Sequence, residues 1–173
     1  MRLQGAFFIV LVHLNQANFY KMIPKEKLQR IIHQTIENIT ALIPGYIDSE
    51  KDWSISGGHV ALCIIDDEGN VYGKIWGEDK LKGRHYFDVA YRKASQAWIT
   101  GYKTGEYERL VFGGKLDYHT FGITLPDLIG WDGGQPIQLN NDTRIYCGFS
   151  GFHGTTDLAL VTKAVEKAVK SIE

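Results

Sequence analysis

Hydrophobic and polar residues alternate along residues 144–149, and the pattern then changes to a helical spacing. Ile145, Cys147 and Phe149 are separated by polar or small residues, as in a half-buried strand. After a glycine-rich turn, apolar residues recur every three or four positions from Leu158 to Ile172, with lysines on the opposite side. The pattern therefore predicts a strand, a turn, and an amphipathic helix packed on a sheet.

The turn between this strand and helix has a composition that suits two roles. Gly148, Gly151 and Gly154 can take backbone angles closed to other residues, and Asp157 or the threonines before it can cap the first helical turn. Such a turn can simply join a strand to a helix. Alternatively, its unpaired amides and the helix dipole can hold an anion, such as a carboxylate or propionate. The sequence leaves both roles open.

Two further segments show regular patterns in the first half of the chain. Apolar residues fall on one helical face from Pro24 to Leu42, and Pro44-Gly45 is expected to end that helix, with an exposed loop over 46–58. Residues 60–65 are apolar on both faces, which predicts a central strand covered on both sides. Turn-forming residues and a second strand at 71–76 complete a predicted hairpin.

The middle of the chain combines one regular segment with one irregular segment. Residues 77–83 read as a polar connection, and a helix with an apolar stripe is predicted from Phe87 to Trp98, with Lys93 off that stripe. Between residues 102 and 131 the periodicity fails and glycines interrupt an aromatic-rich stretch. Long irregular segments in compact domains are often functional, so this one is expected to form a wall of a pocket.

Residues 1–21 form a separate N-terminal apolar extension in this interpretation, and residues 22–173 form a single domain. The apolar run from Ala6 to Leu14 is too short to span a bilayer as a helix, and the residues after it lack the small-x-small pair of a signal-peptide cleavage site. We expect an uncleaved extension that packs on the domain or at an oligomer interface, or a physiological start at Met22. The expected location is cytoplasmic, or secreted if the segment is a signal peptide.

Composition and charge narrow the class of protein. The chain has 173 residues, of which 44% are hydrophobic and 23% charged, as in a globular domain. The net charge of -1, without a basic block, argues against a nucleic-acid-binding protein. Cys63 and Cys147 lie in strand-like apolar runs and are expected to be buried free thiols, with a disulfide between them as the alternative.

Several short motifs follow one another along roughly residues 58–169. The motifs are the turn Asp66–Asn70, the helical Ala90-x-x-Lys93-Ala94, Gly133-Gly134-x-Pro136-Ile137, and Gly148-Phe149-Ser150-Gly151 followed by Asp157. Taken in this order, they resemble the GlcG/HbpS family and the C-terminal domain of PduO-type corrinoid adenosyltransferases. The resemblance implies a profilin-like α+β fold, with an antiparallel sheet of about five strands flanked by helices. It also implies assembly into a homo-oligomer and, in some members, heme binding.

The resemblance and the residues together give a candidate site for heme or a related tetrapyrrole. The predicted cofactor-binding residues are Lys93, His119, Gly151, His153, Gly154 and Asp157. His119 and His153 are the alternative metal ligands, because both lie in glycine-flanked loops beside aromatic residues and heme iron needs only one axial donor from the protein. Lys93 would supply positive charge, and the glycine amides would bind a carboxylate.

Two other functions stay open at this point. The first is an enzyme or accessory subunit acting on an acidic small metabolite or a corrinoid in the same pocket. The second is a structural oligomer subunit whose pocket is filled with side chains. A hydrolase is disfavoured, because Phe152 occupies the last glycine position of the Gly-x-Ser-x-Gly pattern around Ser150.

Overall fold

The computed structural model describes residues 22–47 and 50–172, so the predictions for residues 1–21 lie outside the described residues. Its elements, in chain order, are α1 (Lys25–Ile47), α2 (Glu50–Ser56), β1 (Val60–Asp66), β2 (Val71–Trp76), α3 (Lys80–Thr100), α4 (Thr104–Phe112), the 3-10 helix η1 (Tyr118–Phe121), β3 (Gly134–Gln138), β4 (Arg144–Ser150) and α5 (Gly154–Ile172). None of the helices in these described ranges is long and apolar enough to cross a membrane.

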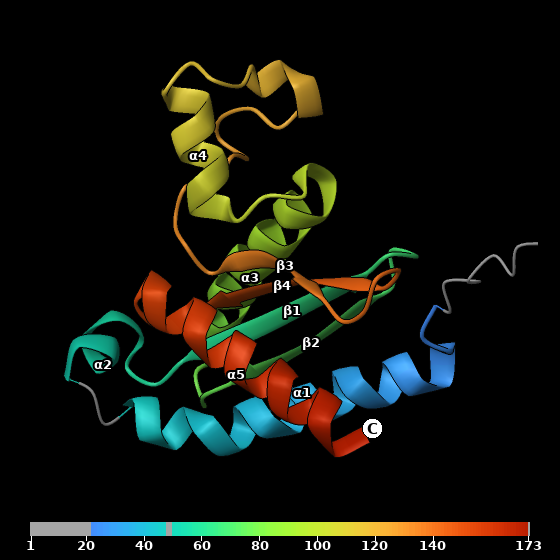
Figure 1. Cartoon of the computed structure of the whole chain (residues 1–173). Helices are drawn as coiled ribbons and strands as arrows, with labels where there is room; N and C mark the ends of the chain where they lie inside the picture. Colours follow the sequence, from blue (N-terminus) through green and yellow to red (C-terminus); the bar gives the residue numbers. More distant parts are fainter. Residues whose placement is uncertain (1–21, 48–49, 173) are drawn as a thin grey trace, which may run out of the picture.

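One antiparallel sheet with the strand order β2-β1-β4-β3 separates two layers of helices (Figure 1). Helices α1 and α5 cover one face, where Ile39 and Leu160 pack on Leu62 and Phe149. Helix α3 covers the other face through alanines that pack on β1 and β4. This arrangement confirms the predicted α+β class with an antiparallel sheet flanked by helices.

The sheet has four strands in the described part of the chain, where about five were expected. The central position of β1 is confirmed, since all seven of its residues are buried, and so is the β1–β2 hairpin, whose turn places Gly69 at φ 83°. The segment that could have supplied another strand forms α4 and η1 instead. There Tyr107 is fully buried and its ring lies edge-on to that of Phe121, so the aromatic residues of this segment pack on one another.

Three predicted loops contain helix. Helix α1 continues through Pro44 to Ile47, because its last turn packs on the core through Tyr46, whose ring stacks on Phe152. Helix α3 begins at Lys80 inside the predicted polar connection, and the Asp79 side chain caps it by accepting from two backbone amides of the first turn. Helix α2 lies in the same predicted loop as the end of α1, and α4 lies in the irregular segment between residues 102 and 131. These stretches lack a long apolar stripe, so the spacing of their apolar residues did not predict the helices.

Helix α3 buries Ala90, Ala94 and Ala97 as predicted, but its buried face is rotated relative to the rest of the predicted stripe. Tyr91 and Trp98, placed on the apolar stripe by sequence, are partly exposed, whereas Lys93 is only 3% exposed. The helix approaches the sheet through small residues, so closely that a Cβ atom on Gly148 would lie 2.0 Å from the Ala90 carbonyl oxygen. The prediction that Lys93 lies off the buried face is therefore wrong, because close packing of alanines turns its side chain inward.

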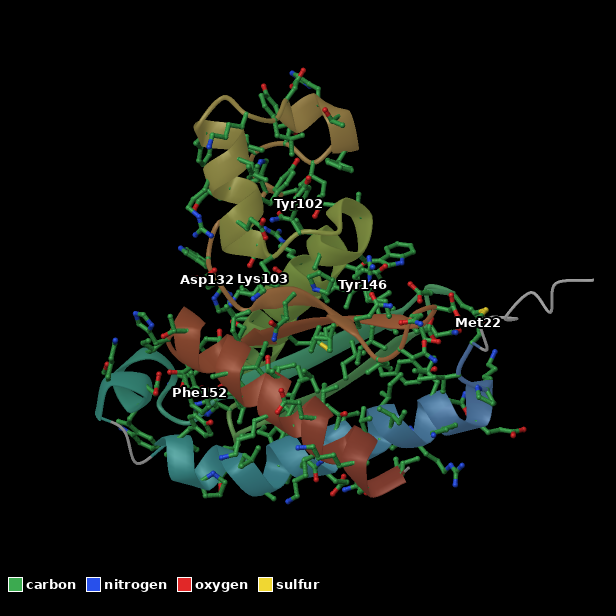
Figure 2. All side chains as sticks on the ribbon, in the orientation of Figure 1. Met22, Tyr102, Lys103, Asp132, Tyr146 and Phe152 are labelled. Carbon is green, nitrogen blue, oxygen red and sulfur yellow. The ribbon has the colours of Figure 1, made fainter. Side chains whose placement is uncertain are left out.

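Helix α4 and η1 form a lobe that projects away from the sheet and the helices that cover its two faces (Figure 1). Lys103 and Asp132 mark the base of this lobe in Figure 2, and Met22 lies at the far end of the sheet from Phe152. A buried clamp joins the lobe to α3. The Gln96 side-chain amide donates to the Ile129 carbonyl and accepts from the Ile129 amide, both at 2.8 Å. This clamp fixes the chain just before Trp131 and Asp132.

Cys63 and Cys147 are buried free thiols, as predicted. Burial raises the pKa of the Cys63 thiol to about 12, and it also raises that of Cys147. Both side chains therefore behave as small apolar groups of the core.

Candidate functional site

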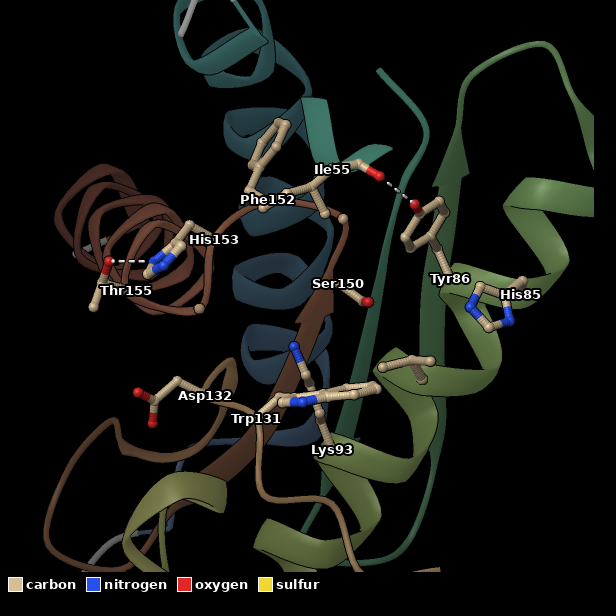
Figure 3. Close-up of a pocket in the computed structure, with 13 residues that line it drawn as sticks. Ile55, His85, Tyr86, Lys93, Trp131, Asp132, Ser150, Phe152, His153 and Thr155 are labelled. Atoms are coloured by element: carbon tan, nitrogen blue, oxygen red, sulfur yellow. Dashed lines mark hydrogen bonds between the residues drawn. The ribbon is translucent and has the colours of Figure 1, made fainter. Parts of the chain in front are cut away.

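A cavity of about 460 Å³ lies between α2, α3, the β4–α5 turn and the chain segment before β3 (Figure 3). This volume falls in the usual range for small-molecule sites, which is roughly 300–1,000 Å³. Its wall is mainly apolar, with several polar groups at intervals. The apolar side chains are Ile55, Val89, Trp131 and Phe152, and the polar ones include His85, Lys93, Asp132, Ser150 and His153.

Lys93 is the charged group on the inner wall of the cavity. It rises from the middle of α3, and its Nζ donates to Asp157 Oδ2 at 3.0 Å and to the Phe149 carbonyl at 2.9 Å. The two side chains are 4% and 1% exposed, so this is a buried ion pair. An ammonium group has three donors. The two contacts use two of them, and the Lys93 side chain points toward the cavity in Figure 3.

Asp157 holds the other side of this ion pair. Its Oδ1 accepts from the Phe152 amide at 3.1 Å, so the carboxylate joins the β4–α5 turn to α3. Burial, with a smaller contribution from the neighbouring Asp52, raises the pKa of Asp157 to about 7 against the opposing effect of Lys93. The carboxyl group is therefore able to exchange a proton near neutral pH.

Gly133 leaves the space that this ion pair needs. It has φ 123°, and a Cβ atom there would lie 2.5 Å from Lys93 Nζ and 2.9 Å from Asp157 Oδ2. The backbone of Gly133 also accepts a hydrogen bond from the Phe149 amide, which extends the β3–β4 pairing. The glycine before β3 thus allows the sheet edge to pack directly over the ion pair.

The β4–α5 turn is partly satisfied by carboxylates from within the chain. The Phe152 amide is bonded to Asp157, and the His153 amide donates to Asp52 Oδ1 at 2.8 Å. In the described part of the chain, the amides of Gly151 and Gly154 have no hydrogen-bond partner, and both residues line the cavity. The turn therefore keeps donors at the cavity, although fewer than its full set of amides.

The structure brings most of the predicted site residues together but separates one of them. Lys93, Gly151, His153 and Gly154 line one cavity, and Asp157 lies directly behind Lys93. His119 lines a different cavity of about 410 Å³ in the lobe, where its ring packs against Tyr118 at a centroid distance of 4.1 Å. His119 and His153 are thus not two choices for one ligand position.

Several lining residues were not identified from the sequence. Trp131 is largely exposed at the cavity, and Tyr86 reaches across to donate to the Ile55 carbonyl at 2.9 Å. His85 also lines the cavity. Ser150, which is 5% exposed, lines the cavity as well. The lone signal available in advance was that Trp131 lies two residues before the glycine pair Gly133-Gly134 of the family motif.

Metal chemistry at this site would depend on a bound cofactor. Within the described ranges, no group of three or more histidine, cysteine or carboxylate side chains is arranged to hold a metal ion. Heme places a smaller demand on the protein, because the porphyrin supplies four of the iron ligands and one histidine can suffice. His153 lies at the cavity, and its Nδ1 contacts the Thr155 hydroxyl at 3.1 Å, which leaves Nε2 as the second ring nitrogen.

Comparison with known proteins identifies structural relatives. No protein-family model matches the chain, and no curated protein matches it. A PduOC:heme complex has a TM-score of 0.54 and 17% identity, covering 84% of this chain and 94% of that one. Protein ORFY of Klebsiella pneumoniae has a TM-score of 0.57 and 19% identity, with coverages of 92% and 99%.

A third solved structure gives the same result. A double mutant of HbpS from Streptomyces reticuli has a TM-score of 0.52 and 19% identity, with 94% of this chain and 98% of that chain covered. At this level of identity the similarity concerns the fold. The chain therefore has the fold shared by HbpS and PduOC, as the resemblance in its sequence predicted.

Proposed function

We propose that this protein binds a small organic anion in the cavity beside Lys93, and that heme or a related tetrapyrrole is the first ligand class to test. The observation that carries the proposal is the buried Lys93 ammonium at the wall of a largely apolar cavity. Ligand sites commonly combine apolar walls with a few fixed polar groups of this kind. Charge-assisted hydrogen bonds to a carboxylate are strongest where water is excluded.

The cavity offers separate contacts for the two ends of such a ligand. A carboxylate or propionate would bind near the Gly151 and Gly154 amides, where the α5 dipole adds positive potential. An apolar ring would contact Val89 and Trp131 on the opposite wall. An open cavity beside Gly151 favours binding over a purely structural subunit whose pocket is filled by side chains.

The residues present fit a heme group at this position. His153 would be the axial donor, the Lys93 ammonium would offset propionate charge, and the apolar wall would contact the macrocycle. A bound heme would supply redox or ligand-binding chemistry at iron. The solved structure of PduOC with heme, which shares this fold, supports testing this ligand first. His119 would require a second site in the lobe.

Titration with hemin and with metal-free protoporphyrin IX tests the proposal. We expect a saturable Soret shift with hemin that His153→Ala alters, and fluorescence changes with protoporphyrin that His153→Ala leaves intact. His119→Ala is the matched control, because that side chain lies in the other cavity. If neither compound binds and the melting temperature does not change, tetrapyrrole binding is overturned.

A second candidate is an enzyme or accessory subunit that acts on an acidic metabolite or a corrinoid in the same cavity. The favouring observation is the contact between a buried amine and a carboxyl group whose pKa is raised to about 7, an arrangement suited to proton transfer. Binding of a simple aromatic carboxylate, without tetrapyrrole binding, would favour this candidate.

We also propose that the protein assembles with a second copy of itself through the β2 edge. The Asp66 amide donates to the Asn70 carbonyl at the hairpin turn, which sets the alternation of hydrogen bonds along the pair. Val71, Gly73 and Ile75 therefore point their backbone groups away from β1. Among the described residues these groups have no partner. An antiparallel copy of the same strand would satisfy them symmetrically.

A further inference from the structure

The amine of Lys93 differs from a surface lysine in its surroundings. Its side chain is 4% exposed, and Val89 and Trp131 line the cavity with it. A lysine amine can attack a carbonyl carbon only after it has lost a proton, and proteins place a base beside the lysines that they use in this way. Lys93 is therefore placed as a nucleophile would be, at the wall of a cavity large enough for a small molecule.

Asp157 is placed to take and return the proton that such chemistry needs. Its Oδ2 lies 3.0 Å from Lys93 Nζ, which is direct hydrogen-bond distance. Burial raises the pKa of this carboxyl group to about 7. Its other oxygen is fixed by the Phe152 amide, so the carboxyl group cannot rotate away without losing that contact.

The ion pair has features that stability alone does not require. A buried ion pair usually adds little stability relative to apolar residues of the same volume, because both charges lose their hydration. Here it also requires a glycine with φ 123° at position 133 to make room for it. The pair, moreover, lies at the wall of the cavity and not in the centre of a packed core.

We propose that Lys93 forms a reversible imine with a small aldehyde or ketone that also carries a carboxylate. This inference rests on the proposed function, because it places the ligand carboxylate at the glycine amides and the carbonyl carbon at Lys93 Nζ. It narrows the ligand class from organic anions to oxo-carboxylates.

The Lys93–Asp157 pair supplies and accepts every proton that imine formation requires. The Lys93 ammonium gives one proton to the Asp157 carboxylate, and the freed electron pair forms a bond to the carbonyl carbon. Proton transfer from nitrogen to oxygen gives a neutral carbinolamine. Asp157 then returns its proton to the hydroxyl group, the carbon–oxygen bond breaks, and water leaves. The product is a protonated imine whose positive charge is again paired with the Asp157 carboxylate.

Reductive trapping in the full chain tests the inference. The protein is incubated with 4-carboxybenzaldehyde and cyanoborohydride, and modified lysines are identified by peptide mass spectrometry. We expect Lys93 to be modified at least about tenfold faster than the exposed Lys103, because the cavity holds the aldehyde beside its amine and the adjacent Asp157 carboxylate accepts the proton. Modification of surface lysines with Lys93 untouched would overturn the inference.

Matched variants and a matched ligand separate this inference from the proposed function. Lys93→Arg keeps the charge and should abolish the fast adduct, whereas Lys103→Arg should leave it unchanged. If Lys93→Arg fails to fold, competition in the wild-type protein by 4-carboxybenzyl alcohol, which has the carboxylate but no carbonyl, serves instead. Calorimetric binding of that alcohol without any Lys93 adduct would leave the proposed function standing and overturn imine formation. Absence of both binding and adduct would overturn both.

Discussion

At the residue scale, the Lys93–Asp157 contact determines the chemistry of the site. Two charged groups from α3 and α5 meet where the sheet edge packs over them, and each has a further backbone partner. Satisfying both groups in this way is what makes their burial tolerable. The same contact has consequences for how the stability of the fold depends on pH.

Asp157 should make the protein less stable as pH rises from about 4 to about 7. Its pKa is about 7 in the folded protein, against an ordinary aspartate value of 3.8, so over this range the folded state holds a proton that the unfolded state has lost. Protonation therefore favours folding, and the associated slope is at most about 1.4 kcal/mol per pH unit. Lys93 from α3 and Asp52 from α2 are the charged groups that act on it.

Urea unfolding at several pH values measures this slope. Asp157→Asn keeps the shape of the side chain without the titration, so its stability should vary less with pH over the same range. Only the slopes are compared, because the substitution also leaves Lys93 without its charged partner. Equal slopes in the two proteins would show that Asp157 does not titrate there.

Gly133→Ala should destabilise the protein by about 2–4 kcal/mol, because the position combines a left-handed φ with a lack of space. The new methyl group would lie 2.5 Å from Lys93 Nζ and 2.7 Å from the Phe149 carbonyl oxygen. Thermal unfolding gives the measurement. Gly45→Ala in α1 is the matched control, since nothing lies within 4 Å of its added Cβ atom, and it should be neutral or slightly stabilising. Similar losses for both variants would contradict this account.

The sequence alone identified some of these residues and missed others for a physical reason. Gly151, Gly154 and Asp157 were found because turn and capping chemistry is local. Lys93 was found through a family resemblance, while its own helical pattern placed it wrongly on the outer side. Its true position depends on close packing of Ala90 and Ala94 against β4, which is a tertiary effect that apolar periodicity does not encode.

At the scale of elements, the Gln96 clamp links helix α3 to the wall of the cavity. The side-chain amide bonds both backbone groups of Ile129, as a neighbouring strand would. Trp131 and Asp132, which line the cavity, follow two and three residues later. Through the clamp, the position of the lobe relative to α3 determines where these two residues lie in the wall of the cavity.

Gln96→Glu should release this clamp. The new carboxylate can still accept from the Ile129 amide, but its second oxygen would face the Ile129 carbonyl oxygen without a hydrogen between them. We expect a loss of about 2 kcal/mol in stability and faster hydrogen exchange at Ile129. Ser95→Ala is a suitable control, because the Ser95 hydroxyl bonds only within its own helix at Arg92 among the described contacts. Unchanged exchange at Ile129 would mean that other contacts hold the segment.

Elements with strong periodicity were predicted well, and the others were not. The β1–β2 hairpin, strand β4 and helix α5 have clear alternation or helical spacing, and the structure confirms all of them. Helix α2 and the first turns of α3 are mainly exposed and polar, so they depend on capping and local contacts in place of an apolar stripe. For the same reason, the segment containing α4 read as an irregular loop.

At the scale of the whole molecule, the two edges of the sheet differ in how they are protected. The β3 edge contains Pro136, which lacks an amide hydrogen and so limits pairing with another strand. The β2 edge has no proline and carries two apolar side chains, Val71 and Ile75, that are 52% and 45% exposed. The difference favours β2 as the edge that pairs with a second copy.

Charges placed on this edge should therefore prevent assembly without unfolding the domain. In an antiparallel β2–β2 pair the two strands lie side by side and are related by a two-fold axis. Val71→Lys and Ile75→Lys together would therefore bring lysines of both copies close to one another. We expect the double variant to sediment as a monomer and the wild-type protein as a dimer or larger assembly. Leu125→Lys, at a more exposed apolar position in the lobe, is the control and should leave assembly unchanged. If the protein pairs through β2 only after residues 1–21 have been removed, then that segment, and not a second copy, covers the β2 edge. Assembly that persists in the double variant would place the interface elsewhere, and the unpaired backbone groups of Val71, Gly73 and Ile75 would then remain in contact with water.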